Sequence, residues 1–174
     1  MVQANMAEAA LTAAHPGCEI IRAVITTTGD RRTDIPLPEV AAASGYIDKG
    51  VFIKELEVEL AAGEIDLAVH SLKDVPSEME AGFAIGAVLP RAGIGDVLVT
   101  KSPGGLAGLP DRAVVATSSV RRARQLRWLR PDLEVAEIRG NVPTRVRKLA
   151  ENPELDGLLL AEAGLRRLDL LQGD

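Results

Sequence analysis

The pattern of hydrophobic and polar positions differs between the two halves of this chain. In the first half, apolar residues recur at helical spacing over 1–14 and 50–62, which predicts a helix in each range. Turn-forming residues without a clear period predict a long loop over 30–48. Short β-branched and aliphatic runs predict strands at 19–27, 65–69, 83–89 and 97–100.

The second half is more regular. The pattern predicts strands at 113–117, 133–138 and 157–160 and helices at 119–129, 143–150 and 162–171. Strands that alternate with helices of this length favour a parallel sheet covered by helices, and hence an α/β fold. The Gly/Pro-rich stretch 102–110 is the best candidate for a boundary, so we expect one domain over 1–99 and another over 100–174.

The charge distribution supports this division. Residues 1–99 hold 7 Lys and Arg against 15 Asp and Glu, a balance of −8, whereas residues 100–174 hold 13 against 10, a balance of +3. A basic second half in an acidic chain indicates a unit that handles anions. The overall acidity and the four aromatic residues disfavour nucleic-acid binding, and no apolar run approaches the ~20 residues of a membrane span.

Three polar segments follow predicted strands, where open parallel sheets bind their ligands: 117–122, 139–145 and 70–76. In the first two, serine or glycine precedes a helix and arginines follow, an arrangement suited to a carboxylate or phosphate. The alternative is a capping serine followed by a solvated basic helix. The third brings Lys73 and Asp74 to a turn, either as a catalytic corner or as an ordinary surface pair. His70 is more typical of a structural histidine, and no metal site is indicated.

Longer stretches, in the same order along the chain, resemble the hydroxymethylbilane synthase (porphobilinogen deaminase) family. The matching segments cover nearly the whole sequence and are 27–30, 49–57, 66–76, 117–122, 139–145 and 160–168. The most distinctive of them is 66–76, which reads Asp-Leu-Ala-Val-His-Ser-Leu-Lys-Asp-Val-Pro.

The resemblance implies two lobes like those of periplasmic binding proteins, each a mixed or parallel sheet with flanking helices, followed in the family by a third domain. It implies a transferase of tetrapyrrole (haem and porphyrin) biosynthesis that joins four porphobilinogen units head to tail with loss of ammonia. In the family, the product grows on a dipyrromethane cofactor attached to a cysteine of the third domain. The resemblance further implies a monomeric cytoplasmic protein that binds porphobilinogen and neither nucleic acid nor membrane.

The resemblance assigns Asp74 as the catalytic residue, which stabilises the cation left when ammonia departs. It also assigns a larger set to the binding of substrate and cofactor: Ser71, Lys73, Thr117, Ser118, Ser119, Arg121, Arg122, Arg139, Gly140, Arg145, Arg167, Asp30 and Lys49. Arginines suit porphobilinogen because it carries acetate and propionate groups.

The sequence departs from the family pattern in several places. The family's opening strand, the return strand of the first domain and the cysteine-bearing domain have no counterpart, and Cys18 does not match the attachment site. We therefore expect a fragment that is inactive by itself and lacks the cofactor-attachment cysteine. The alternative is a non-catalytic two-lobed module that binds a polycarboxylate or another anionic small molecule.

Overall fold

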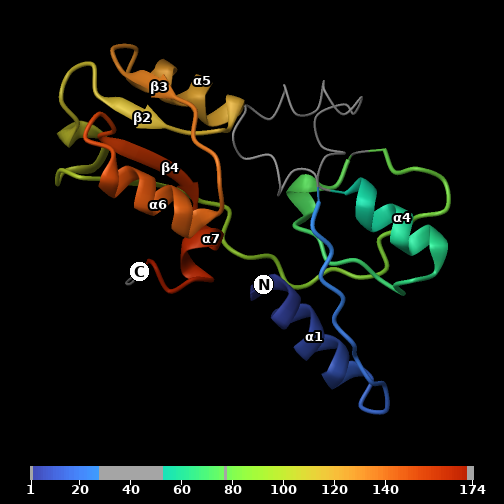
Figure 1. Cartoon of the computed structure of the whole chain (residues 1–174). Coiled ribbons are helices and arrows are strands. Elements are labelled where there is room, and N and C mark those ends of the chain that lie inside the picture. Colours follow the sequence, from blue (N-terminus) through green and yellow to red (C-terminus); the bar gives the residue numbers. More distant parts are fainter. Residues whose placement is uncertain (1, 28–52, 77, 172–174) are drawn as a thin grey trace. The chain divides into compact units, whose positions relative to one another are not determined.

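The computed structural model of the 174-residue chain describes residues 2–27, 53–76 and 78–171. These residues form two compact units, Met1–Pro90 and Arg91–Asp174 (Figure 1). The division falls between residues 90 and 91, whereas the sequence favours a boundary between residues 99 and 100. The strand predicted at 97–100 consequently belongs to the second unit. Over the described ranges, no helix is long and apolar enough to cross a membrane.

The second unit is an α/β structure built on a mixed sheet of four strands in the order β1-β4-β2-β3. The strands are β1 (Asp96–Thr100), β2 (Val114–Ala116), β3 (Glu134–Ala136) and β4 (Gly157–Ala161). β2 runs parallel to both β3 and β4, as the sequence predicts for that part of the chain. β1 pairs antiparallel with β4, and this makes the sheet mixed.

Three helices connect and follow these strands: α5 (Val120–Leu129), α6 (Val142–Glu151) and α7 (Glu162–Arg166). The first two lie close to their predicted bounds. The third was predicted to reach residue 171 but ends at Arg166, because Asp169 adopts a left-handed backbone (φ 54°) and the Leu170 amide donates back to the carbonyl of Leu165. This reversal stops the helix although the apolar pattern continues.

Alternating residues of the strands build a core on each face of the sheet. On one face, Ala116, Leu158 and Leu160 pack with Leu149 of α6 and Leu165 of α7. On the other face, Val115 packs with Leu126 of α5 and with Leu109, which follows the short 3₁₀ helix η3 (Gly105–Gly108). Because successive side chains of a strand point to opposite faces, both faces of β2 are apolar and covered.

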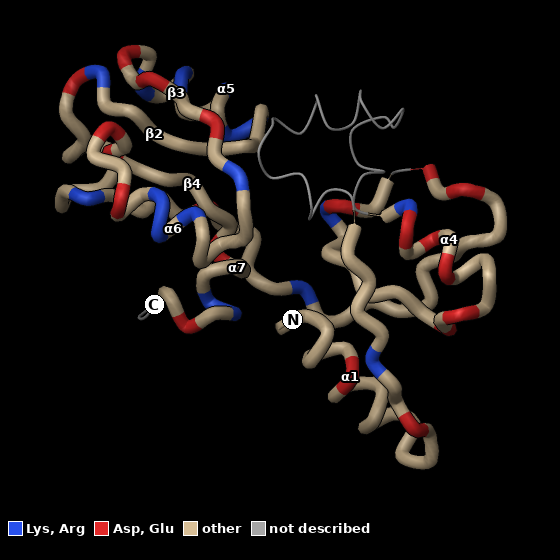
Figure 2. Tube along the Cα trace, viewed as in Figure 1, with Lys and Arg blue, Asp and Glu red and all other residues tan. Residues whose placement is uncertain are grey.

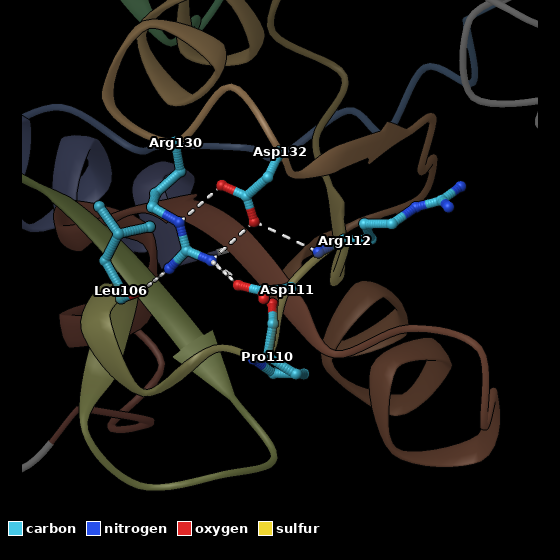
Figure 3. Close-up of polar contacts among 6 residues, drawn as sticks. All are labelled: Leu106, Pro110, Asp111, Arg112, Arg130 and Asp132. Atoms are coloured by element: carbon cyan, nitrogen blue, oxygen red, sulfur yellow. Dashed lines mark hydrogen bonds and ion pairs between the residues drawn. The ribbon is translucent and has the colours of Figure 1, made fainter.

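A fork of hydrogen bonds anchors η3 to the turn that follows α5 (Figure 3). Arg130 donates from Nε and Nη2 to the two carboxylate oxygens of Asp132, each at 2.8 Å, and from Nη1 to the carbonyl of Leu106 at 3.0 Å. The backbone amide of Arg112 also donates to Asp132. The paired guanidinium therefore holds the pKa of the Asp132 carboxyl well below its ordinary value.

The described part of the first unit contains helices and no strand. α1 (Val2–Ala14) and α4 (Lys54–Ala62) confirm the predicted helices, and the short 3₁₀ helix η2 (Leu72–Asp74) follows. Residues 28–52, which include the predicted loop at 30–48 and the start of the second predicted helix, lie outside the described residues.

The strands predicted at 19–27, 65–69 and 83–89 are wrong, because these segments are irregular in the structure. Their apolar side chains are largely solvent-exposed, with Ile21 at 83%, Val24 at 72% and Val88 at 70% exposure. β-Branched composition favours an extended backbone, but a strand also needs a neighbour that takes up its backbone hydrogen bonds. Within the described ranges, none of these segments joins a sheet.

Candidate functional site

The basic segments of the second unit lie at the carboxyl ends of β2 and β3, as the sequence predicts. Figure 2 shows basic positions on α5 and α6, in contrast to the acidic positions along α4 of the first unit. The two strand-to-helix junctions have different local structures, and each one positions a different part of the candidate site.

At the first junction, the hydroxyl groups organise the start of α5. Ser119 is the N-cap, and its Oγ accepts a hydrogen bond from the backbone amide of Arg122 at 3.4 Å. The buried Thr117 accepts from the amide of Ser119 at 3.2 Å. Thr117 and Ser119 thus satisfy amides that the sequence pattern had suggested for a ligand. Ser118 is exposed, and its Oγ accepts a hydrogen bond from Arg145 of the second junction.

At the second junction, Gly140 and Asn141 shape the start of α6. Gly140 has φ 112°, and a Cβ placed on it would lie 2.8 Å from Cγ2 of Thr144, so this position requires glycine. Asn141 is the N-cap and accepts from the amide of Thr144 at 2.9 Å. Pro143 lies in the first helical turn, as predicted. The Asn-x-x-Thr spacing is a sequence signal for this cap.

Arg145 joins the two junctions. Its Nε donates to the carbonyl of Gly140 at 2.6 Å, and its Nη1 donates to Oγ of Ser118 at 2.9 Å. Burial lowers the pKa of Arg145, and the positive charges of Arg122 and Arg139 lower it further. Arg122 and Arg139 therefore each lie near enough to Arg145 for their charges to act on it. We call Arg122, Arg139 and Arg145 the arginine cluster.

A cluster of neighbouring cations favours an anionic ligand. Each guanidinium presents a planar set of donors that matches a carboxylate, and neutralising the mutual repulsion adds to the affinity. The negative charge of Glu137 partly offsets the lowering of the Arg145 pKa. The arrangement suits a ligand with more than one carboxylate better than it suits a single small anion.

Two residues at the cluster were not identified from the sequence. Asp96, the first residue of β1, pairs with Arg122 at 2.6 Å. Lys148 donates from Nζ to the carbonyl of Arg139 at 3.1 Å. Lys148 follows Arg145 by three positions, so the two share one side of α6 and a helical projection reveals the pair. Asp96 had no local signal, because only the order of the strands brings it near α5.

The other predicted arginines differ in environment. Arg121 is exposed on α5, whereas Arg167 is half-buried just after α7. The Nε of Arg167 is buried and has no hydrogen-bond partner within the described residues. A buried guanidinium donor without an acceptor is costly, which favours an anion at this position. The described contacts do not link Arg167 to the arginine cluster.

The first unit carries the predicted corner at 70–76. Ser71 precedes η2, and its hydroxyl donates to the side-chain oxygen of Gln3 on α1 at 2.7 Å. Asp74 is half-buried at the end of η2, and its amide donates to the carbonyl of Ser71, while Lys73 is exposed. The corner is thus fixed by α1 rather than by a strand.

His70 is partly buried beside this corner. Burial lowers the pKa of its imidazole, and the nearby carboxylates of Asp74 and Glu57 oppose that shift. The neutral form is therefore favoured, which agrees with a structural histidine. Asp30 and Lys49, the remaining predicted binding residues, lie outside the described residues.

Comparison with known proteins gives a consistent result over almost the whole chain. The family model described as porphobilinogen deaminase, dipyromethane cofactor binding domain, matches residues 1–173. The chain is 46% identical over 166 residues to the porphobilinogen deaminase of Syntrophobacter fumaroxidans, which covers 95% of this chain and 52% of that protein. It is 48% identical over 170 residues to the porphobilinogen deaminase of a Roseiflexus species, covering 98% of this chain and 54% of that protein. The chain spans about half the length of these curated relatives.

Proposed function

We propose that this chain, which belongs to the porphobilinogen deaminase family, binds porphobilinogen and carries out part of the synthesis of hydroxymethylbilane. The full reaction joins four porphobilinogen units head to tail and releases one ammonia for each unit. The observation that carries the proposal is the arginine cluster, because its three neighbouring guanidinium groups favour a ligand rich in carboxylates.

The acetate and propionate groups of porphobilinogen would bind in the second unit. Arg122, Arg139 and Arg145 supply the main charge, and Ser118 supports Arg145 by accepting its hydrogen bond. The backbone carbonyl of Gly140, at the second junction, accepts a hydrogen bond from Nε of Arg145 and so holds this side chain in place. Arg121, Arg167, Thr117 and Ser119 complete this set by their agreement with the family pattern.

Asp74 would act on the reacting ring. When the aminomethyl C–N bond breaks and ammonia leaves, the substrate becomes an electrophilic azafulvene cation. A carboxylate beside it stabilises the positive charge and accepts a hydrogen bond from the pyrrole N–H. A new C–C bond then forms with the next pyrrole, whose ring proton is lost. The half-buried position of Asp74 strengthens this interaction, because solvent screens it less.

The same residue types fit a dipyrromethane cofactor. The arginine cluster is suited to its carboxylates, as is the buried Nε of Arg167, which has no partner among the described residues. Ser71 and Lys73 would lie beside the cofactor. When bound, dipyrromethane supplies the pyrrole end on which the product is extended. Asp30 and Lys49 belong to this assignment through the family pattern. The family pattern further implies that the chain forms two lobes like those of periplasmic binding proteins. It also implies a cytoplasmic monomer that has no nucleic-acid or membrane partner.

Isothermal titration of this chain with porphobilinogen tests the binding step. Arg145→Gln removes one charge and two hydrogen bonds, so we expect an affinity loss of about tenfold or more. Arg147→Gln is the matched control: Arg147 is exposed on the same helix and pairs only loosely with Glu151 at 3.8 Å. Equal affinities for the Arg145 variant and the wild type would contradict the proposal.

The chemical step is tested in the protein at its full natural length. Asp74→Asn keeps the shape of the side chain and removes its charge, so porphobilinogen binding should persist while ammonia release falls sharply. Near-normal ammonia release by this variant would refute the role of Asp74.

A second candidate is a non-catalytic module that binds polycarboxylates, because the arginine cluster lies within the second unit alone. Intact-protein mass spectrometry after incubation with porphobilinogen separates the two candidates. Pyrrole additions to the full-length protein support the enzyme, whereas saturable binding without any addition supports the module.

A further inference from the structure

One residue of the arginine cluster, Arg122, pairs with a carboxylate that was not among the predicted site residues. Asp96 Oδ1 lies 2.6 Å from Nη2 of Arg122. The Arg122 side chain is only 23% exposed, and the Asp96 side chain is 39% exposed. This short contact differs from the ordinary surface pair of Arg112 and Glu134, which is 3.3 Å long and much more exposed.

Sheet topology explains how Asp96 reaches the cluster. β2 and β4 are parallel and end at the same edge of the sheet, where α5 begins after β2. β1 runs antiparallel to β4, and its first residue, Asp96, pairs with Ala161 at the end of β4. The start of an antiparallel strand therefore lies at the edge where its parallel neighbours end. A carboxylate placed there meets the first turn of α5.

The contact constrains Arg122 in the way that other contacts constrain Arg145. The Arg145 guanidinium is fixed by the Gly140 carbonyl and by Ser118. The side chain of Arg122 has no hydrogen bond and no other ion pair among the described residues, and like charges lie nearby. Without Asp96, repulsion would turn this side chain towards solvent. With Asp96 bound to Nη2, the donors at Nε and Nη1 are left for a ligand.

We propose that Asp96 is a positioning residue whose carboxylate orients the Arg122 guanidinium and thereby prepares the arginine cluster for a carboxylate ligand. The inference rests on the proposed function for the identity of that ligand. Orientation before binding raises affinity because the ordering of the side chain is complete when the ligand arrives.

Two substitutions separate orientation from charge. Asp96→Asn retains a side-chain oxygen at the position that contacts Nη2 of Arg122 but removes the negative charge. Asp96→Ala removes both. Titration with porphobilinogen should show about tenfold weaker binding for the alanine variant, and binding at least as tight as wild type for the asparagine variant. Glu134→Ala removes the exposed surface pair and serves as the matched control, with unchanged affinity expected.

NMR of the arginine side-chain nitrogens gives a readout that needs no ligand. Rotation of the Arg122 guanidinium should be slow in the wild type and the asparagine variant, and fast in the alanine variant. The Arg122→Lys variant assigns the signal.

The inference is overturned if the alanine variant binds as tightly as wild type, if both Asp96 variants lose affinity equally, or if guanidinium rotation is unchanged by Asp96→Ala. If the wild type does not bind porphobilinogen, the proposed function fails. The rotation measurement then decides the role of Asp96 by itself.

Discussion

The two units of this chain use similar apolar segments with different results. In the second unit, the described residues bury a two-sided core around β2 and β4, with Val115 and Leu158 fully excluded from solvent. In the first unit, Ile53 is the one buried hydrophobic residue within the described ranges, while Ile21 and Val88 are largely exposed. Hydrophobic sequence is present in both units, but within the described residues only the second has a sheet that covers it.

The difference lies in where each strand finds its neighbours. In the second unit, strand, helix and strand follow one another closely, so the local chain supplies both the neighbouring strand and the covering helix. The apolar segments 19–27, 65–69 and 83–89 of the first unit form no strand within the described residues. Apolar composition therefore determines what a segment is able to bury, and pairing determines whether it does so.

The largest effect should come from the core of the second unit. Leu158→Ala removes a fully buried side chain at the middle of the sheet, and we expect a loss of about 2–5 kcal/mol in the free energy of unfolding. Urea unfolding followed at the amides of β2 and β4 by NMR measures this loss.

The same change in the first unit should cost little. Leu67 is 51% exposed, so Leu67→Ala should shift the unfolding free energy reported by the amides of α4 by no more than about 0.5 kcal/mol. A loss for Leu67→Ala equal to that for Leu158→Ala would remove the contrast between the units.

A backbone substitution should have an intermediate effect. Gly140→Ala places a Cβ against Thr144 at a left-handed backbone position, and we expect a loss of about 1–3 kcal/mol in unfolding free energy. Gly17→Ala in the first unit is the control, because a Cβ added there would meet no atom within 4 Å. Urea midpoints of the two variants give the comparison, and equal midpoints would show that Gly140 is under no constraint.

The smallest expected effect is the dependence of stability on pH. As the pH falls, the loss of stability should appear in the first unit before the second. Burial lowers the pKa of His70 below its ordinary 6.5, so the unfolded chain takes up this proton more readily. The related stability is complete above pH 6.5 and is lost as pH falls through the folded-state pKa. NMR titration of the imidazole should show a pKa below 6.5; a value above 6.5 would contradict the burial.

The second unit should respond only in stronger acid. Asp132 has its pKa held far below the ordinary 3.8 by Arg130, so the contribution of this pair is complete above pH 3.8 and is lost as pH falls further. The wild type and Asp132→Asn should therefore differ in urea midpoint at pH 7 and converge as the pH falls well below 3.8. A constant difference down to the lowest accessible pH would contradict the assignment.

Much of the second unit was predictable from its sequence. Periodicity located α5, α6, β2 and β4. The strand-to-helix junctions also predicted that Arg139 and Arg145 converge with Arg121 and Arg122; in the structure the charges of Arg122 and Arg139 act on Arg145, and Arg121 is exposed. Asn141 and Lys148 were within reach of sequence reasoning, through cap spacing and helical projection. The end of α7 was not, because the left-handed backbone at Asp169 does not follow from the apolar pattern.

What the sequence by itself determined is the chemical content of the chain: an acidic first half, a basic second half, and the arginines that follow each strand. Family membership also follows from the sequence, since matching segments run through almost its full length. What only the tertiary structure decided is which groups meet. The antiparallel β1 brings Asp96 to Arg122, and Ser118 accepts a hydrogen bond from Arg145 of another segment. Neighbouring residues determine short-range geometry, but contacts between distant segments depend on strand order and direction, which no local pattern specifies.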